Sequence, residues 1–216
     1  MTGRTTRAQG RYAGRTADER HDERRRRFLD AALELFGAGP GYRATTVAGL
    51  CEAAGLSTRQ FYQEFRTLEE VLSVLHLQVN EWSESAVVAA LDRTNGLPST
   101  ERYAAVFRAY ADSVATDPRR IRITFTEIVG ISPELDEQRL TRRARWIDLM
   151  CAEAAAAVAR GEAVDRDYRV AATAFIGGVN GLLHDWATGW VDATLDQVVD
   201  ELVRMLLTML RPAPES

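Results

Sequence analysis

The residues whose types and spacing suggest chemistry lie in one short stretch, Thr58-Arg59-Gln60 followed by Tyr62. A guanidinium group pairs with the O6/N7 edge of guanine, a side-chain amide pairs with adenine, and a threonine methyl contacts the methyl of thymine. Phenol and hydroxyl groups donate to phosphate oxygens. The stretch therefore holds the groups that direct readout of duplex DNA requires, provided that the elements around it turn them outwards.

Two short helices joined by a glycine turn are predicted to position this set. Thr45 or Thr46 is a good N-cap for the first helix, and Ser57 is a good N-cap for the second. Gly55 falls where the chain must turn sharply, since glycine adopts positive φ without steric cost. The expected inward residues are Val47, Leu50, Cys51, Ala54, Phe61 and Phe65, with Leu56 at the corner. The expected outward residues are Thr58, Arg59, Tyr62 and Gln63, with Gln60 on the flank. Taken alone, the stretch also fits an ordinary helical hairpin with a polar face.

The flanks of this stretch carry a wider pattern. The pattern reads Ala32-Leu-Glu-Leu-Phe36, Gly41-Tyr42, Thr45-Thr46-Val47, Ala54-Gly55-Leu56-Ser57, Tyr62 and Phe65. In these residues and their spacing, over about residues 25–75, the chain resembles the tetracycline-repressor (TetR) family of transcriptional regulators. The resemblance implies a homodimer whose paired recognition helices read a roughly palindromic operator. Two departures are Cys51 in place of the usual alanine and the absence of the lysine that often follows Phe65.

The resemblance also assigns DNA contacts to matching positions. Base contacts are implied for Thr58, Arg59 and Gln60. Phosphate contacts are implied for Thr46, Tyr62, Tyr42 and the start of the next helix at Thr67. Arg66 or Thr67 would replace the missing lysine.

The hydrophobic periodicity along the whole chain predicts an all-α fold of about nine helices, because no stretch alternates with period two over strand length. Apolar residues recur at helical spacing from about His21. Further helices are expected at about 67–92, 99–114, 118–129, 133–160, 167–189 and 195–210. We expect a mobile tail over residues 1–20, a helix-turn-helix domain over 21–66, and an effector-binding and dimerisation domain over 67–216.

Charge separates the two parts of the chain. Residues 1–66 hold 12 arginines against 8 acidic residues, whereas the remainder holds 15 arginines against 23, and lysine is absent. A basic amino-terminal part on an acidic body favours contact with a polyanion. The tail carries four arginines, Arg4, Arg7, Arg11 and Arg15. They either contact the phosphate backbone or the minor groove of DNA, or belong to a solvated tail that has no role in binding.

The carboxy-terminal part is expected to hold a ligand cavity and a dimer face. Candidate pocket residues are the aromatics Phe107, Tyr110, Phe125 and Trp146 with Asn180 and His184 as polar groups, although aromatics at helical spacing are usually core. Small residues such as Gly177 and Gly181 allow close helix approach. Apolar residues from Leu195 to Leu210 form a stripe that fits either a four-helix dimer bundle through the last two helices or packing within the protomer.

The resemblance implies a repressor that a small apolar or amphipathic ligand releases from operator DNA, while the residues themselves do not distinguish repression from activation. An architectural or protein-responsive regulator without a pocket is the alternative. An enzyme is disfavoured, because three histidines, two distant cysteines and no glycine-rich loop after a strand supply no catalytic pair, metal cluster or phosphate loop. We expect no cofactor, no metal and no membrane partner. The absence of a secretion signal or membrane-length apolar run predicts a cytoplasmic location.

Overall fold

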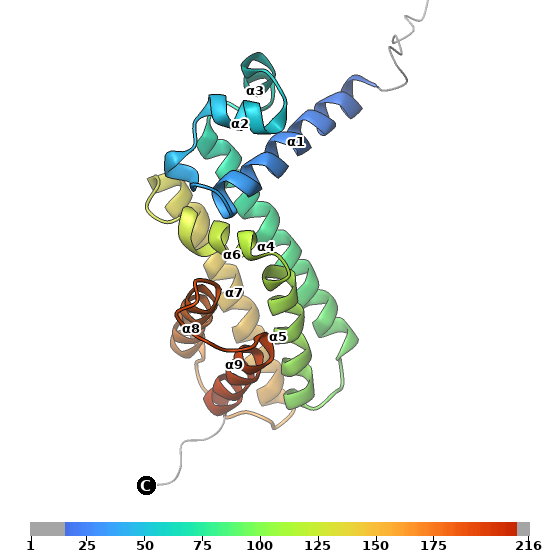
Figure 1. The fold of residues 1–216 in the computed structure, drawn as a ribbon. Coiled ribbons are helices and arrows are strands. Elements are labelled where there is room, and N and C mark those ends of the chain that lie inside the picture. The colour runs from blue at the N-terminus through green and yellow to red at the C-terminus, as the bar shows by residue number, and fades with distance from the viewer. Residues whose placement is uncertain (1–15, 211–216) are drawn as a thin grey trace, which may run out of the picture.

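A computed structural model describes residues 16–210, and this part of the chain is all-α, as predicted (Figure 1). Its nine α-helices are α1 (Ala17–Gly37), α2 (Val47–Ala54), α3 (Thr58–Glu64), α4 (Leu68–Arg93), α5 (Ser99–Ala115), α6 (Pro118–Arg122), α7 (Pro133–Ala159), α8 (Arg169–Ala187) and α9 (Leu195–Leu210). Two short turns complete the set, the 3₁₀ turn η1 (Tyr42–Ala44) and the π-helical turn η2 (Ile123–Glu127).

The start of α1 differs from the expectation. Residues 17–20 were predicted to belong to the tail, but they form the first turn of the helix. Thr16 and Glu19 make a capping box, in which each side chain accepts from the other residue's backbone N–H. The periodicity missed this turn because its side chains are exposed and polar. The tail arginines at positions 4, 7, 11 and 15 lie outside the described residues.

The segment predicted as one helix over 118–129 divides into α6 and the π-helical η2. The division has a packing reason, because the segment contributes to two different cores. Ile121 packs into the core cluster built mainly by α5, α8 and α9 (the lower cluster), whereas Ile123 and Ile128 pack into the cluster built by α1, α2, α3 and the first half of α4 (the upper cluster). A single helix of regular pitch does not direct these three side chains into two cores. The π turn at Ile123–Glu127 rotates the residues that follow Ile121 about the helix axis, so that they face the upper cluster.

The two cores share one long helix. The upper cluster is built on Phe28, Phe36 and Phe61, and the lower cluster on residues such as Phe175 and Leu202. Helix α4 runs from the upper part into the lower one (Figure 1) and contributes Val71, Leu72 and Leu75 above and Val79 below. A displacement of α4 in the lower part is therefore transmitted to the upper part, since packed interiors deform little.

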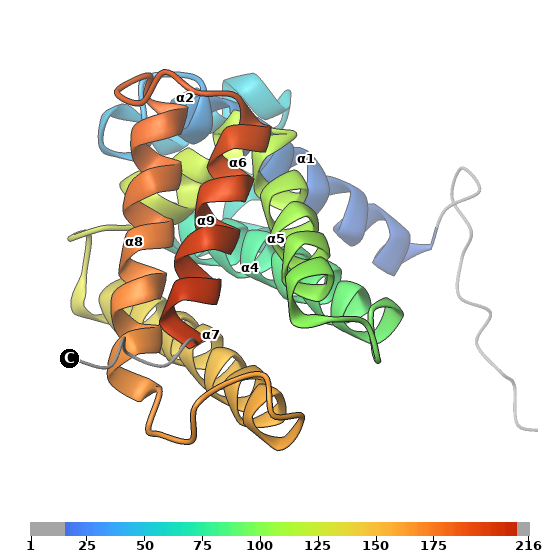
Figure 2. The same cartoon turned by 90° about the horizontal axis from the view of Figure 1, so that it is seen from below.

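Helix α9 corrects one interpretation of the sequence. Its apolar stripe does not face outwards: Val198, Val199, Leu202, Leu206 and Leu210 are all less than 10% exposed within the single chain. Figure 2 shows α9 lying between α8 and α5, which cover this stripe. The alternative of packing within the protomer is therefore the correct one for these residues, and the outer face of α9 is mainly polar.

No helix within residues 16–210 is long and apolar enough to cross a membrane. No three side chains of His, Cys, Asp or Glu in the same range gather as metal ligands would. Both cysteines are free thiols, with Cys51 buried and Cys151 half-buried.

Candidate DNA interface and effector cavity

The turn between α2 and α3 is fixed by backbone geometry and by one arginine. Gly55 is left-handed, with φ +61°, and its N–H returns to the carbonyl groups at the end of α2. Arg27 of α1 donates from Nη2 to the carbonyl oxygens of Ala54 at 2.5 Å and Gly55 at 3.1 Å. The carbonyl groups that a helix end leaves unsatisfied are thus satisfied from a neighbouring helix.

The rotation of α3 about its axis is set by its buried side. Phe61 is fully buried and meets Phe28 of α1 edge-to-face, with ring centroids 5.5 Å apart. Phe65 follows the helix and is also buried, as predicted. With these two rings inside, the opposite side of α3 faces solvent.

That opposite side carries the residues predicted to contact DNA. Thr58, Arg59 and Gln63 are exposed, and the Tyr62 side chain is 61% exposed although its ring edge rests on Phe61. Arg59 makes no hydrogen bond or ion pair with any residue between 16 and 210. Its guanidinium group is thus available to a partner outside the chain. In Figure 1, α3 lies at the tip of the molecule, far from α9.

Gln60 is positioned differently from its neighbours. Its Oε1 accepts from the backbone N–H and the hydroxyl of Ser57, both at 2.9 Å, which completes the cap of α3. Because Oε1 is occupied, only the Nε2 donor is free. The bidentate contact with adenine that an unrestrained glutamine makes would therefore require this cap to open.

The residues expected to contact phosphates lie at helix starts around the same surface. Thr46 caps α2 and Thr67 caps α4, each by accepting from a backbone N–H at 3.1 Å. Tyr42 is half-buried, with its ring edge-to-face on Phe36. Burial and the nearby Glu69 carboxylate raise the pKa of Tyr42, so its hydroxyl remains a neutral donor. Helix amino termini with exposed hydroxyls suit phosphate.

Sequence reasoning missed a buried carboxylate that supports α3. The Glu64 side chain is fully buried, 2.7 Å from Arg24 Nε and 2.5 Å from His21 Nδ1. Arg25 donates to the Glu64 carbonyl oxygen and lies over the Phe65 ring. These contacts attach the first half of α1 to the end of α3. No local pattern indicates them, because the partners are about 40 residues apart in sequence.

The lower part contains an apolar cavity. Its volume is about 80 Å³, several times the 10–15 Å³ that one water molecule needs on the same measure. Among the predicted residues, Phe107, Tyr110, Trp146 and Asn180 line it, together with aliphatic side chains of α4, α8 and α9. Phe107 meets Phe175 and Tyr110 meets Trp146 edge-to-face. Burial raises the pKa of Tyr110.

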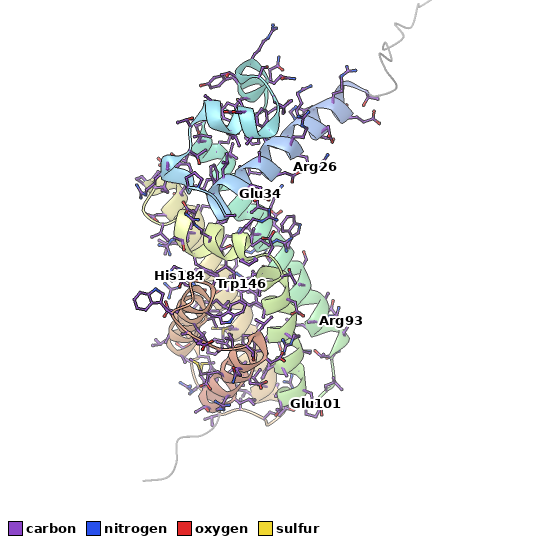
Figure 3. All side chains as sticks on the ribbon, in the orientation of Figure 1. Arg26, Glu34, Arg93, Glu101, Trp146 and His184 are labelled. Atoms are coloured by element: carbon purple, nitrogen blue, oxygen red, sulfur yellow. The ribbon has the colours of Figure 1, made fainter. Side chains whose placement is uncertain are left out.

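A second cavity of about 280 Å³ adjoins the first and shares Tyr110, Trp146, Ile176 and Asn180 with it. We call it the arginine chamber, because Arg139, Arg142 and Arg143 of α7 line it. The remaining predicted residues, Phe125 and His184, line this chamber, and His184 lies beside Trp146 in Figure 3. The structure therefore places all six predicted pocket residues around two adjoining spaces that share part of their lining.

One segment connects these cavities to the upper part. Phe125 and Thr124 of η2 line the chamber, while the next residue, Thr126, lies 3.1 Å from His184 Nδ1 through its hydroxyl. At the end of η2, Glu127 accepts from the Tyr42 backbone N–H and from Arg122 Nε, both at 2.8 Å. Arg43 also donates to the Gly130 carbonyl oxygen. A shift of η2 therefore moves the turn that precedes α2.

Comparison with known families decides the identity of this fold. Residues 28–75 match the model of bacterial regulatory proteins of the tetR family, and residues 96–210 match the model of the tetracyclin repressor-like C-terminal domain. The chain belongs to the TetR family. TetR-family chains are DNA-binding transcriptional regulators and not enzymes, and the predicted helix-turn-helix is that of the family.

Solved structures of other bacterial regulators have the same fold. The fatty acid degradation regulator FadR from Bacillus halodurans is 18% identical with a TM-score of 0.75, covering 87% of this chain and 96% of its own. FadR from Bacillus subtilis, solved in complex with stearoyl-CoA, is 17% identical with a TM-score of 0.72, covering 86% and 99%. A tetR-family protein from Rhodococcus RHA1 is 21% identical with a TM-score of 0.71, covering 88% and 98%. A search of curated proteins gave no match.

Proposed function

We propose that this TetR-family regulator is a homodimeric repressor that an amphipathic small molecule releases from its operator. The observation that carries the proposal is the exposed, unpartnered face of α3 above a lower part that contains a cavity. Residues 21–66 read DNA, residues 67–216 bind the effector and the second protomer, and the protein acts in the cytoplasm where its DNA is.

We assign base contacts to Thr58 and Arg59, with Gln60 contributing its free Nε2 donor. Phosphate contacts fall to Tyr62, Thr46, Thr67 and Tyr42. Arg59 and Tyr62 are both exposed donors on the face, which supports their assignment as the main contacts.

Gel-shift titration tests the assignment, with an operator sequence that is first obtained by in vitro selection of the DNA that the wild type binds. Arg59→Ala should weaken binding about 10- to 100-fold, because a good base contact contributes roughly 1–3 kcal/mol. Arg93→Ala, at the far end of α4 (Figure 3), removes the same charge away from α3 and is the matched control. Full binding by the Arg59→Ala/Gln60→Glu variant would refute the assignment; glutamate at position 60 keeps an acceptor for the Ser57 cap.

The cavity supports regulation by a ligand over a purely architectural role. A solid core beneath Phe107 and Trp146 would favour a regulator without a pocket, whereas both residues line open space. A cavity lined mainly by aliphatic and aromatic side chains, with Glu153 and Asn180 as its polar members, favours an apolar group. The B. subtilis relative holds stearoyl-CoA, which carries a long aliphatic chain. We therefore propose an effector with an aliphatic chain.

Release from DNA follows from the position of η2. A ligand that displaces Phe125 moves η2, and Glu127 transfers this displacement to the turn before α2. The two α3 helices then no longer match successive major grooves, so operator affinity falls by linkage.

The outer face of α8 supports dimerisation. Val170, Ala174, Gly177 and Gly181 recur at helical spacing and are exposed, and a Cβ atom added to Gly181 would meet nothing within 4 Å. A second α8 can approach such a face closely. Gly181→Arg should give a monomer in light scattering, and Glu101→Arg, on the far side of α5, should not. A dimer that survives Gly181→Arg would place the interface elsewhere.

A further inference from the structure

The arginine chamber has an unbalanced charge. Three arginines and two histidines are among its lining residues, and none of the lining residues is aspartate or glutamate. Burial, reinforced by the charges of Arg142 and Arg139, lowers the pKa of His76 to about 4. His76 is therefore neutral near pH 7, and the positive potential of the chamber is that of its guanidinium groups.

The three arginines differ in their partners. Arg142 lies 3.4 Å from Glu81 and 3.5 Å from Glu84, so its charge is balanced on the outer side of α7. Arg143 donates to the Thr173 carbonyl oxygen at 3.2 Å and has no carboxylate within 4 Å among residues 16–210. Arg139 has one longer contact, 3.6 Å from Asp136. Arg143 and Arg139 are thus the under-neutralised pair.

Both of these arginines also carry an unsatisfied buried donor. The Nε atoms of Arg139 and Arg143 are shielded from solvent and make no hydrogen bond in the described part of the chain, although Arg139 Nε lies 3.6 Å from the Asp136 carboxylate. Buried polar groups in native proteins nearly always have partners, and an orphaned charged donor is costly. The Arg143 donor, which has no carboxylate within 4 Å among residues 16–210, indicates that an acceptor from outside the chain completes it, and Arg139 lies close enough along α7 to share that acceptor.

The neighbouring apolar cavity restricts the kind of acceptor. Tyr110, Trp146, Ile176 and Asn180 belong to both spaces, so one molecule could extend from one into the other. The first space favours a hydrocarbon chain, and the second offers guanidinium donors that match carboxylate or phosphate oxygens. The chamber reaches the surface beside Val129 and Gly181, which are both exposed.

We propose that the effector is an amphipathic anion whose carboxylate or phosphate head accepts hydrogen bonds from Arg143 and Arg139 while its chain occupies the apolar cavity. This inference rests on the proposed ligand-responsive function and adds the charge and the position of the head group. Asn180, on the wall common to both spaces, lies where head and chain meet.

Isothermal titration calorimetry of the full chain without DNA tests the inference with dodecanoate, dodecyl phosphate, dodecanol and dodecyltrimethylammonium as probes. The two anions should bind more tightly than the alcohol by roughly tenfold to hundredfold, the range expected for charge-assisted hydrogen bonds, and the cation least of all. The carboxylate and phosphate probes distinguish the two possible head groups. Dodecanol that binds as tightly as both anions, or no binding by either anion, would overturn the inference.

Arg143→Met and Arg139→Met should each remove about tenfold or more of the affinity for the anions and leave the affinity for dodecanol unchanged. Arg145→Met is the matched control on the same helix, because Arg145 is exposed and pairs with Glu84 outside the chamber. Arg143→Lys, which keeps the charge, provides a second reading if loss of the Thr173 contact prevents folding. Equal anion affinity in Arg143→Met and the control would refute the inference.

A separate gel-shift assay distinguishes this inference from the proposed function. Anion binding in the calorimeter without release of operator DNA would contradict the release mechanism and leave the head-group site intact. Release of operator DNA by dodecanol but by neither anion, unchanged in Arg143→Met, would support the release mechanism and contradict the head-group site.

Discussion

Glu127 offers a direct test of the connection between cavity and DNA-binding domain. Its carboxylate accepts from the Tyr42 backbone N–H and from Arg122, and these contacts join η2 to the turn before α2. Glu127→Ala removes both acceptors and introduces no new charge. The Glu127 side chain is 9% exposed, so water replaces it poorly, whereas the Arg122 side chain is 36% exposed.

The expected loss of stability follows from these two exposures. A buried N–H without an acceptor costs about 1–3 kcal/mol. The lost ion pair adds less than about 1 kcal/mol, because the Arg122 guanidinium regains water. We therefore expect Glu127→Ala to lower the free energy of unfolding by about 2 kcal/mol, which lowers the Tm by roughly 4–8 °C for a chain of this size.

Thermal denaturation followed by circular dichroism measures this change, and Glu137→Ala, at an exposed position on α7, is the control. A double-mutant cycle with Arg122→Ala should give a coupling energy of about 1 kcal/mol. The same variant should bind dodecanoate normally but release operator DNA less completely. An unchanged Tm together with an unchanged release would refute the role of Glu127.

Three further predictions concern stability. Gly55→Ala should cost about 1–2 kcal/mol in urea denaturation because of its left-handed backbone, with an added Cβ 2.8 Å from Arg27 Nη2; an unchanged midpoint would contradict this. His76 has a folded pKa of about 4, below its ordinary 6.5, so the unfolded chain binds more protons between these values and stability falls as pH falls. Between pH 7 and pH 5 the free energy of unfolding of the wild type should fall by roughly 2 kcal/mol more than that of His76→Gln. Parallel plots of unfolding free energy against pH for the two proteins would contradict this prediction. Arg102→Met should cost about 3 kcal/mol by leaving Glu153 without its two 2.9 Å hydrogen bonds, and Arg102→Met/Glu153→Met should recover part of that loss.

The helix-turn-helix could be predicted from sequence because its signals are local. Gly55, Ser57, Phe61 and Phe65 lie within a dozen residues, and each acts on its own turn of backbone. The cap at Thr46 was equally readable, since a cap bonds to the third residue after it. Such interactions leave a mark in sequence spacing.

Features that depend on distant partners could not be predicted. The Gln60 side chain has the amide group that can pair with adenine, yet its Oε1 completes the cap of its own helix. The outward stripe expected on α9 is inside because α5 and α8 cover it, and helical periodicity does not say what covers an apolar face. Arg139 and Arg143 have ordinary helix-surface spacing, and only the packing of α8 and η2 around them makes a chamber.

The buried face of α9 affects how the regulator responds to its own amount. A single chain already covers this stripe, so its core does not depend on a partner, and in the dimer proposed above folding and association are separate equilibria. At concentrations below the dimer dissociation constant, the two-headed species grows with the square of the protomer concentration. Operator occupancy would then change steeply over a narrow range of expression, and halving the cellular copy number would lower the occupancy by the proposed dimer more than twofold.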